Sequence, residues 1–209
     1  IENNGRQVLE NRLIYGNNAY RMDYDDLEQK LADPQTTLMI LCNPQNPAGR
    51  IWSREELEKV GVLCKKHGVT VISDEIHCDI TEPGKQYVPF ASINDDCRDN
   101  SITLISPTKA FNIAGLQTAA ISVPSPRLRH KVWRAINTDE CAEPNVFSVT
   151  AAIAALTDGG EWLDSLNEYL SESKKTVYRF LDENIPNVKA LHSDATYLML
   201  SLIHISEPT

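Results

Sequence analysis

The chain has 209 residues, of which 42% are hydrophobic and 23% charged, and its formal net charge is -9. These values are typical of a globular protein with one good-sized core, or with one domain and part of another. Because an acidic surface gains nothing from meeting nucleic acid or an anionic membrane, we expect neither as a partner. No apolar run approaches the ~20 residues that a bilayer requires, and the first residues lack the pattern of a signal peptide.

Five cysteines are scattered along the chain, at Cys42, Cys64, Cys78, Cys97 and Cys141. Their odd number and wide spacing do not favour a disulfide framework, so we expect a reducing cytoplasmic location. Structural zinc sites use close pairs such as Cys-x-x-Cys, and the sequence has no such pair. The sequence therefore predicts no metal site.

Two patterns define the expected elements: continuous apolar runs for buried strands, and apolar residues three or four apart for helices. Residues 81–100 are rich in Pro, Gly, Asn and Asp and predict a loop with at most a helical turn. In chain order the predicted elements are a helix at 23–31, a strand at 37–42, a helix opened by the capping box Ser53–Glu56 and closed at Gly68, strands at 69–73, 101–105 and 116–123, helices at about 127–137, 146–157 and 161–184, and strands at 188–191 and 196–200. Alternating strands and helices predict an α/β fold with a mainly parallel sheet sandwiched by helices.

Polar residues lie just past the ends of three of the predicted strands: Asn46, Asp74 and Lys109. Loops at the carboxyl ends of parallel strands meet at one edge of the sheet, where ligands bind, so we expect these side chains to converge. Taken singly, each has an ordinary alternative. Asn46 could shape a turn, Asp74 could cap a helix or form an ion pair, and Lys109 could be a solvated surface charge.

The motif Ser106–Lys109 predicts the chemistry of this edge. A lysine at the end of a buried strand loses its proton easily and becomes a nucleophilic amine, as a Schiff-base lysine requires. A serine hydroxyl one turn earlier suits a phosphate, which favours pyridoxal 5'-phosphate (PLP) as the cofactor. A buried Asp74 needs a cationic partner, and the pyridinium nitrogen of PLP is one. Asn46 could donate to the ring phenolate oxygen, and Lys109 could act as the base at the substrate α-carbon.

The order of these motifs resembles the PLP enzymes of the aspartate aminotransferase fold. More narrowly, Asn46–Trp52, Asp74–His77 and Lys109–Leu116 resemble the MalY/PatB branch, the cystathionine β-lyases. This resemblance implies cleavage of a carbon–sulfur bond, in which an amino acid such as cystathionine is converted to a thiol, pyruvate and ammonia. It also implies a homodimer whose active site is shared between two subunits.

The resemblance assigns a role to each matching residue. It implies that Lys109 forms the Schiff base, Asp74 holds the pyridinium nitrogen, Asn46 the phenolate oxygen and Ser106 the phosphate. His77 stands where aminotransferases carry a tyrosine that also reaches the phenolate oxygen, although a histidine with a purely structural role remains an alternative. The Asn46–Pro47 peptide bond is implied to be cis.

Two departures from the family pattern matter. Gln117 occupies the position at which aminotransferases place an arginine on the phosphate, and the family is roughly twice as long as this chain. We therefore expect an internal piece, in which residues 1–160 are part of the large PLP-binding domain, 161–185 a connecting helix and 186–200 the start of a truncated small domain. Residues 201–209 do not match the family and are expected to be a non-native tail.

Other functions remain open at this point. An aminotransferase would share Lys109, Asp74 and Asn46 with a lyase. From another class, the protein could be a regulatory binding protein, since the branch is similar to proteins that restrain a transcription regulator. An isolated fragment could also be inactive and bind PLP weakly or not at all. A nicotinamide dehydrogenase is disfavoured because no Gly-x-Gly-x-x-Gly follows a predicted strand.

Overall fold

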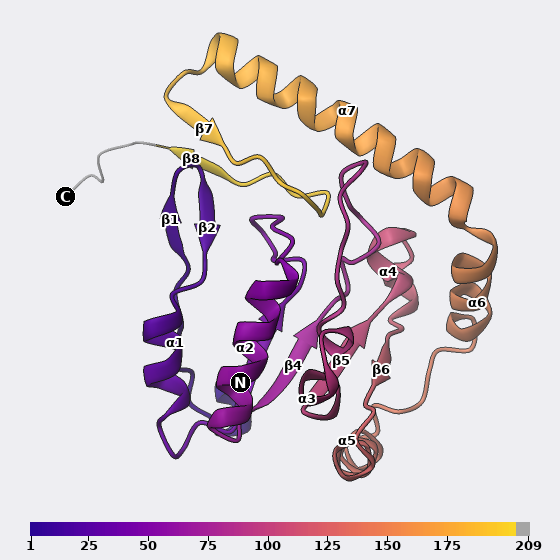
Figure 1. Ribbon diagram of the computed structural model, residues 1–209. Helices are drawn as coiled ribbons and strands as arrows, with labels where there is room; N and C mark the ends of the chain where they lie inside the picture. The colour runs from indigo at the N-terminus through magenta and orange to yellow at the C-terminus, as the bar shows by residue number, and fades with distance from the viewer. Residues whose placement is uncertain (204–209) are drawn as a thin grey trace.

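A four-stranded sheet forms the centre of the computed structural model, which describes residues 1–203 (Figure 1). Its strands are β3 (Leu38–Cys42), β4 (Thr70–Asp74), β5 (Ser101–Ile105) and β6 (Ala120–Ser122). Strands β3, β4 and β5 are parallel, and β6 pairs with β5 in the antiparallel sense. The prediction of an α/β fold with a mainly parallel sheet is confirmed. The expected tail falls largely on residues 204–209, outside the described part of the chain.

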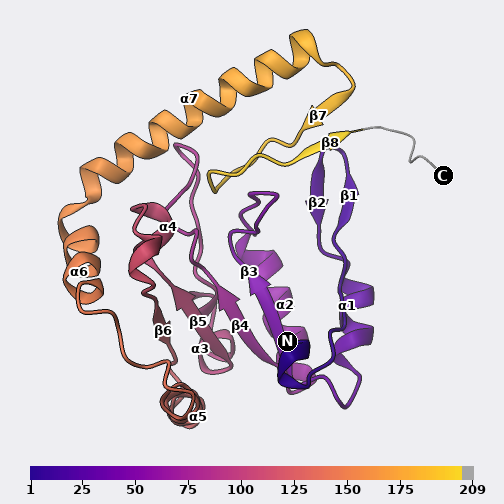
Figure 2. The ribbon, with the colours of Figure 1, turned by 180° about the vertical axis from the view of Figure 1, so that it is seen from behind.

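Helices and two small strand pairs surround this sheet (Figures 1 and 2). The helices are α1 (Tyr24–Leu31), α2 (Arg54–Lys66), α3 (Asp95–Asp99), α4 (Pro107–Ala110), α5 (Pro126–Thr138), α6 (Ser148–Asp158) and α7 (Gly160–Asn184), with short 3-10 turns at Glu2–Asn4, Phe90–Ser92 and Ala114–Leu116. The antiparallel pairs are β1 (Ile14–Gly16) with β2 (Ala19–Arg21), and β7 (Val188–Ala190) with β8 (Ser201–Ile203).

The capping box at the start of α2 is formed as predicted. The Ser53 hydroxyl accepts the backbone N–H of Glu56 at 3.2 Å, and the Glu56 carboxylate accepts the N–H of Ser53 at 2.9 Å. These two bonds satisfy amides that have no partner inside the helix. The helix then buries one face, with Leu57, Val60 and Cys64 each 0% exposed.

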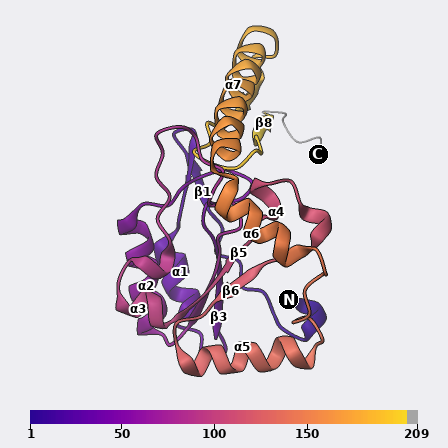
Figure 3. The ribbon, with the colours of Figure 1, turned by 90° about the vertical axis from the view of Figure 1, so that its right-hand side faces the viewer.

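The core lies between the sheet and the helices α1 and α2, with α3 on the same side (Figure 3). Side chains along β3 alternate between the two faces of the sheet. Leu41 points into this core and is 5% exposed, whereas Leu38 and Ile40 on the opposite face are each 53% exposed. The helix-covered face therefore supplies most of the buried apolar surface in the described residues.

Helix α7 passes over the end of the sheet at which β4 finishes (Figure 1). Its Asn167 donates to the carbonyl of Asp79 at 3.0 Å, and Lys174, which is buried, pairs with Glu82 at 2.8 Å. These contacts fix the helix to the loop after β4. Among residues 1–203, no helix is long and apolar enough to cross a membrane.

Some sequence expectations about these elements were wrong. The strand predicted at 196–200 lies instead at Ser201–Ile203, because Thr196 has the left-handed φ of 67° that an extended run does not tolerate. The strand predicted at 116–123 is shortened to Ala120–Ser122, since a 3-10 turn ends at Gln117 with φ 50°. The β1–β2 hairpin was not predicted, although its turn is an Asn17-Asn18 pair with positive φ.

The predicted apolar side of α7 is also only partly buried. Leu163 and Leu166 are half-buried, but Trp162 is 49% and Tyr169 is 70% exposed. Trp162 stacks on Phe111, with ring centroids 5.6 Å apart, which covers one face of the indole.

Candidate active site

The carboxyl ends of three neighbouring strands lie level at one edge of the sheet. Cys42, the last residue of β3, pairs with Asp74 of β4, and Asp74 pairs with Leu104 of β5. The loop after β3 leads to Asn46, and the turn after β5 leads through α4 to Lys109. The peptide bond before Pro47 is cis, as the resemblance implied, and so is the bond between Asn43 and Pro44.

His77 connects these loops. Its Nε2 lies 3.3 Å from Nδ2 of Asn46, and the histidine is 4% exposed. Burial and the positive charge of Lys109 lower the pKa of His77, while the carboxylate of Asp74 opposes this shift. His77 therefore contacts Asn46 and lies within the electrostatic influence of both Lys109 and Asp74.

The thiol of Cys42 shares this environment. Burial raises the pKa of Cys42, and the negative charge of Asp74 raises it further. The thiol is therefore neutral at pH 7, and its polarisable sulfur lies near the carboxylate of Asp74. Sequence reasoning treated this cysteine only as one of five scattered thiols, although its place at the end of an apolar run was the available signal.

Three polar groups at this edge have few partners among the described residues. Asp74 accepts only the backbone N–H of Ile76, at 3.3 Å, and neither Asp74 nor Lys109 forms an ion pair within residues 1–203. Nδ1 of His77 is buried with no hydrogen-bond partner in the same range. Asp74 and Lys109 are half-buried, so water can reach them, whereas a buried polar atom such as Nδ1 of His77 is normally satisfied and therefore suits a polar ligand.

Ser106 is arranged differently from the other predicted site residues. It caps the start of α4, accepting the N–H of Thr108 at 3.2 Å, and its hydroxyl donates to the carbonyl of Thr118 at 2.6 Å. The hydroxyls of Ser106 and Thr108 are 2.7 Å apart. A phosphate contact therefore requires the Ser106 proton to turn away from Thr118, and that role stays a prediction. Gln117 is exposed.

Glu75 is a buried acid that sequence reasoning missed as a structural anchor. It is 2% exposed and accepts hydrogen bonds from the Ser73 hydroxyl at 2.7 Å, from the backbone N–H of Phe90 at 3.0 Å and from the Tyr87 hydroxyl. Burial raises the pKa of its carboxyl group. Residues 74 and 75 point to opposite sides of the chain, so Glu75 holds the loop at 87–90 while Asp74 faces the site.

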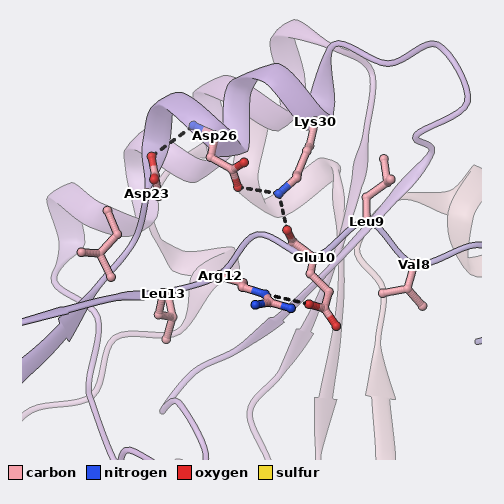
Figure 4. A pocket seen from close by; sticks show the side chains of 9 residues that line it. Val8, Leu9, Glu10, Arg12, Leu13, Asp23, Asp26 and Lys30 are labelled. Carbon is pink, nitrogen blue, oxygen red and sulfur yellow. Dashed lines mark hydrogen bonds and ion pairs between the residues drawn. The ribbon is translucent and has the colours of Figure 1, made fainter. Parts of the chain in front are cut away.

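A groove of about 550 Å³ lies elsewhere, between residues 8–14 and helix α1 (Figure 4). Its charged groups have partners: Lys30 pairs with Asp26 at 2.7 Å, Arg12 pairs with Glu10 at 3.0 Å, and Asp23 accepts the backbone N–H of Asp26 at 3.1 Å. Because these charges are already compensated, the groove offers no reactive group, and the sheet edge is the better candidate for an active site.

Comparisons with known proteins show the family of the chain. The model of the family described as "Aminotransferase class I and II" matches residues 3–206. Cystathionine beta-lyase PatB of Bacillus subtilis is 48% identical over 95% of this chain and 51% of PatB.

Two solved structures are similar as well. Cystalysin from Treponema denticola, which contains a pyridoxal 5'-phosphate cofactor, has a TM-score of 0.93 and 29% identity over 96% of this chain and 51% of its own. The PLP-bound C-S lyase from Staphylococcus hominis has a TM-score of 0.83 and 39% identity over 90% of this chain and 47% of its own. The chain spans about half the length of these proteins, and it belongs to the class I and II aminotransferase family.

Proposed function

We propose that the protein is a PLP-dependent carbon–sulfur β-lyase, which cleaves a sulfur amino acid such as cystathionine to a thiol, pyruvate and ammonia. The observation that supports this proposal is the 3.3 Å contact between Asn46 and His77 beside the level ends of β3 and β4, where the charges of Lys109 and Asp74 both influence His77. The choice of a lyase is supported by the 48% identity to a cystathionine beta-lyase and by the likeness to a C-S lyase.

The residues present fit the cofactor. An amine at Lys109 suits the cofactor aldehyde, and the uncompensated carboxylate of Asp74 suits a protonated ring nitrogen. Asn46 and His77 would face the phenolate oxygen, and Ser106 would contact the phosphate after its hydroxyl turns. When bound, PLP supplies an electron sink that stabilises negative charge on the substrate α-carbon.

The protein side chains then have distinct tasks. Lys109 would act as the base that takes the proton from the substrate α-carbon. Asp74, as a carboxylate, would keep the ring nitrogen of PLP protonated. Because Nδ2 of Asn46 is a donor, Nε2 of His77 must accept, so the proton of the neutral imidazole sits on Nδ1. The neighbouring charge of Lys109 favours this neutral form.

A coupled assay tests the proposal. Full-length protein supplied with PLP and cystathionine, and with no keto acid, should release pyruvate and ammonia in equal amounts. Lys109→Ala should abolish release, whereas Lys131→Ala, on the exposed surface of α5, should not change it. An aminotransferase would form product only after a keto acid is added, and that result would replace the lyase assignment.

We further infer that the protein is a homodimer in the cytoplasm, with the large domain, connecting helix and small domain divided at residues 160 and 185. The dimer is supported by large apolar side chains exposed on and before helices α5 and α6. They are Trp133, Val146, Phe147, Ile153 and Leu156. Burying such side chains between subunits is favourable. Analytical ultracentrifugation of full-length protein tests this, because a monomer at micromolar concentration would contradict it.

A further inference from the structure

A short segment late in the chain, Ser193–Tyr197, is bound to the loop that carries Asn46. The carbonyl of Gly49 accepts the backbone N–H groups of both Asp194 and Ala195, each at 2.8 Å. We call residues 193–197 the clamp segment. Two donors on one carbonyl use both of its acceptor positions, so this contact fixes the end of the Asn46 loop.

The fit at Gly49 is close. Gly49 has φ 66°, and a Cβ atom added there would lie 2.4 Å from the carbonyl oxygen of Ala195 and 2.4 Å from Cβ of Ser193. Glycine is therefore the residue that lets the two backbones approach. The contact is a built junction between distant parts of the chain, with no space for a larger side chain.

The clamp segment also binds the residues that follow His77. The N–H of Thr196 donates to the carbonyl of Ile80 at 2.8 Å, and the N–H of Glu82 donates to the carbonyl of Asp194 at 2.8 Å. An ion pair between Lys85 and Asp194 at 2.7 Å adds to this side. One segment thus bonds to both loops whose side chains, Asn46 and His77, meet in the site.

Tyr197 ends the clamp segment against His77. The centroids of the two rings are 5.6 Å apart with an interplanar angle of 68°, an edge-to-face contact. Thr196, which precedes it, is fully buried and has a φ of 67°, so the backbone that presents Tyr197 is held in place. The tyrosine itself is 41% exposed and does not belong to the buried hydrophobic core.

We propose that Tyr197 is a positioning residue of the active site: its ring holds the imidazole of His77 against Asn46, and the clamp segment couples the two loops. The identity of the ligand that this site binds rests on the proposed function. The positioning itself is a property of the chain alone, because every contact that carries it lies between residues of the chain.

The titration of His77 measures this positioning directly. The groups that face it are Asn46, Lys109 and Asp74, and burial lowers its pKa. Proton NMR of the purified protein, with His77→Asn to assign the signal, should show Tyr197→Phe titrating like the wild type. Tyr197→Ala should raise the midpoint by about half a pH unit or more, because water then reaches the ring.

The controls separate positioning from general loosening. Tyr169→Ala removes a tyrosine that is 70% exposed on α7 and should leave the His77 midpoint unchanged. If Tyr197→Ala does not fold, judged by circular dichroism, Tyr197→Leu takes its place and should give a smaller rise. An unchanged midpoint in the folded alanine or leucine variant overturns the proposal, as does an equal rise in Tyr169→Ala.

A second measurement separates this proposal from the proposed function. PLP binding, followed by the change in cofactor absorbance, should be weaker by about tenfold in Tyr197→Ala and unchanged in Tyr197→Phe. If the wild type gives no PLP signal, the proposed function fails while the titration still decides the role of Tyr197. If PLP binds equally well to both variants and the midpoint does not move, the positioning role fails and the cofactor assignment stands.

Discussion

Replacing Glu75 by Gln should destabilise the protein without removing any atom from the site. The carboxylate is 2% exposed and accepts three hydrogen bonds, two of them at Oε1 and one, from the hydroxyl of Tyr87, at Oε2. Glutamine keeps an acceptor at the first position and places an NH2 group at the second. The change therefore removes the negative charge and turns one acceptor into a donor.

The magnitude follows from these contacts. A hydrogen bond to a charged acceptor contributes about 1.5–3 kcal/mol, and a buried donor left without an acceptor costs about 1–3 kcal/mol. Because the Tyr87 hydroxyl can rotate and accept from the new NH2 group, we expect Glu75→Gln to lower the free energy of unfolding by about 2 kcal/mol. Glu75→Ala leaves all three donors unpaired and should cost about 4 kcal/mol or more.

Urea unfolding followed by circular dichroism measures both variants, with Glu168→Gln, an exposed glutamate on α7, as the control. The control should unfold with the wild type. If Glu75→Gln stays within about 0.5 kcal/mol of the wild type at neutral pH, where surface substitutions usually lie, the anchoring role of Glu75 is refuted.

The pH dependence of the same variant has a definite sign. Burial raises the pKa of Glu75 above its ordinary value of 4.5, so the folded protein holds this proton more tightly than the unfolded chain. Stability from this group is therefore greatest below pH 4.5 and falls as the pH rises through the raised value. The cost of Glu75→Gln should be larger near about pH 4 than at about pH 7, and a cost that grows with pH would contradict this reasoning.

Three further changes have expected outcomes. Trp52→Ala removes a side chain that is 1% exposed and donates to the carbonyl of Cys42 at 2.9 Å, so urea unfolding should show a loss of about 3–5 kcal/mol, and a loss below about 1 kcal/mol would contradict its place in the core. Ser53→Ala removes the cap of α2 and should cost about 1 kcal/mol, whereas Ser53→Asp should restore most of it. The pKa of His77 is lower in the folded protein than its ordinary value of 6.5, so as the pH falls the unfolded chain protonates this histidine before the folded protein does. The contribution of neutral His77 to stability is therefore lost as the pH falls from 6.5 through the pKa of the folded protein. His77→Asn should flatten that part of the stability profile, and an unchanged profile would show that His77 is not the group responsible.

The convergence of the site was predictable because it depends on a simple property of parallel sheets. Asn46, Asp74 and Lys109 each follow an apolar run, and parallel strands bring such positions to one edge. His77 lies three residues after Asp74, close to the end of β4, and this position allows it to contact Asn46. The roles of these side chains at the site remain predictions.

The remaining features depend on contacts that no local pattern encodes. Thr196 was placed in a strand because its neighbours are apolar, but its left-handed backbone ends that strand and presents Tyr197 to His77. The partners of Glu75 come from a loop with little periodicity, and the tight junction at Gly49 is visible only once Ser193 lies beside it. Tertiary contacts outweighed local preference at these positions.

The proposed function requires Lys109 to be the amine that reacts with the cofactor aldehyde. Full-length protein is incubated with PLP, reduced with borohydride, digested and mapped by mass spectrometry, with Lys109→Arg as the matched control. We expect a label on Lys109 in the wild type and none at that position in the variant. A label spread over exposed lysines such as Lys131 and Lys175, with Lys109 unmodified, would contradict it.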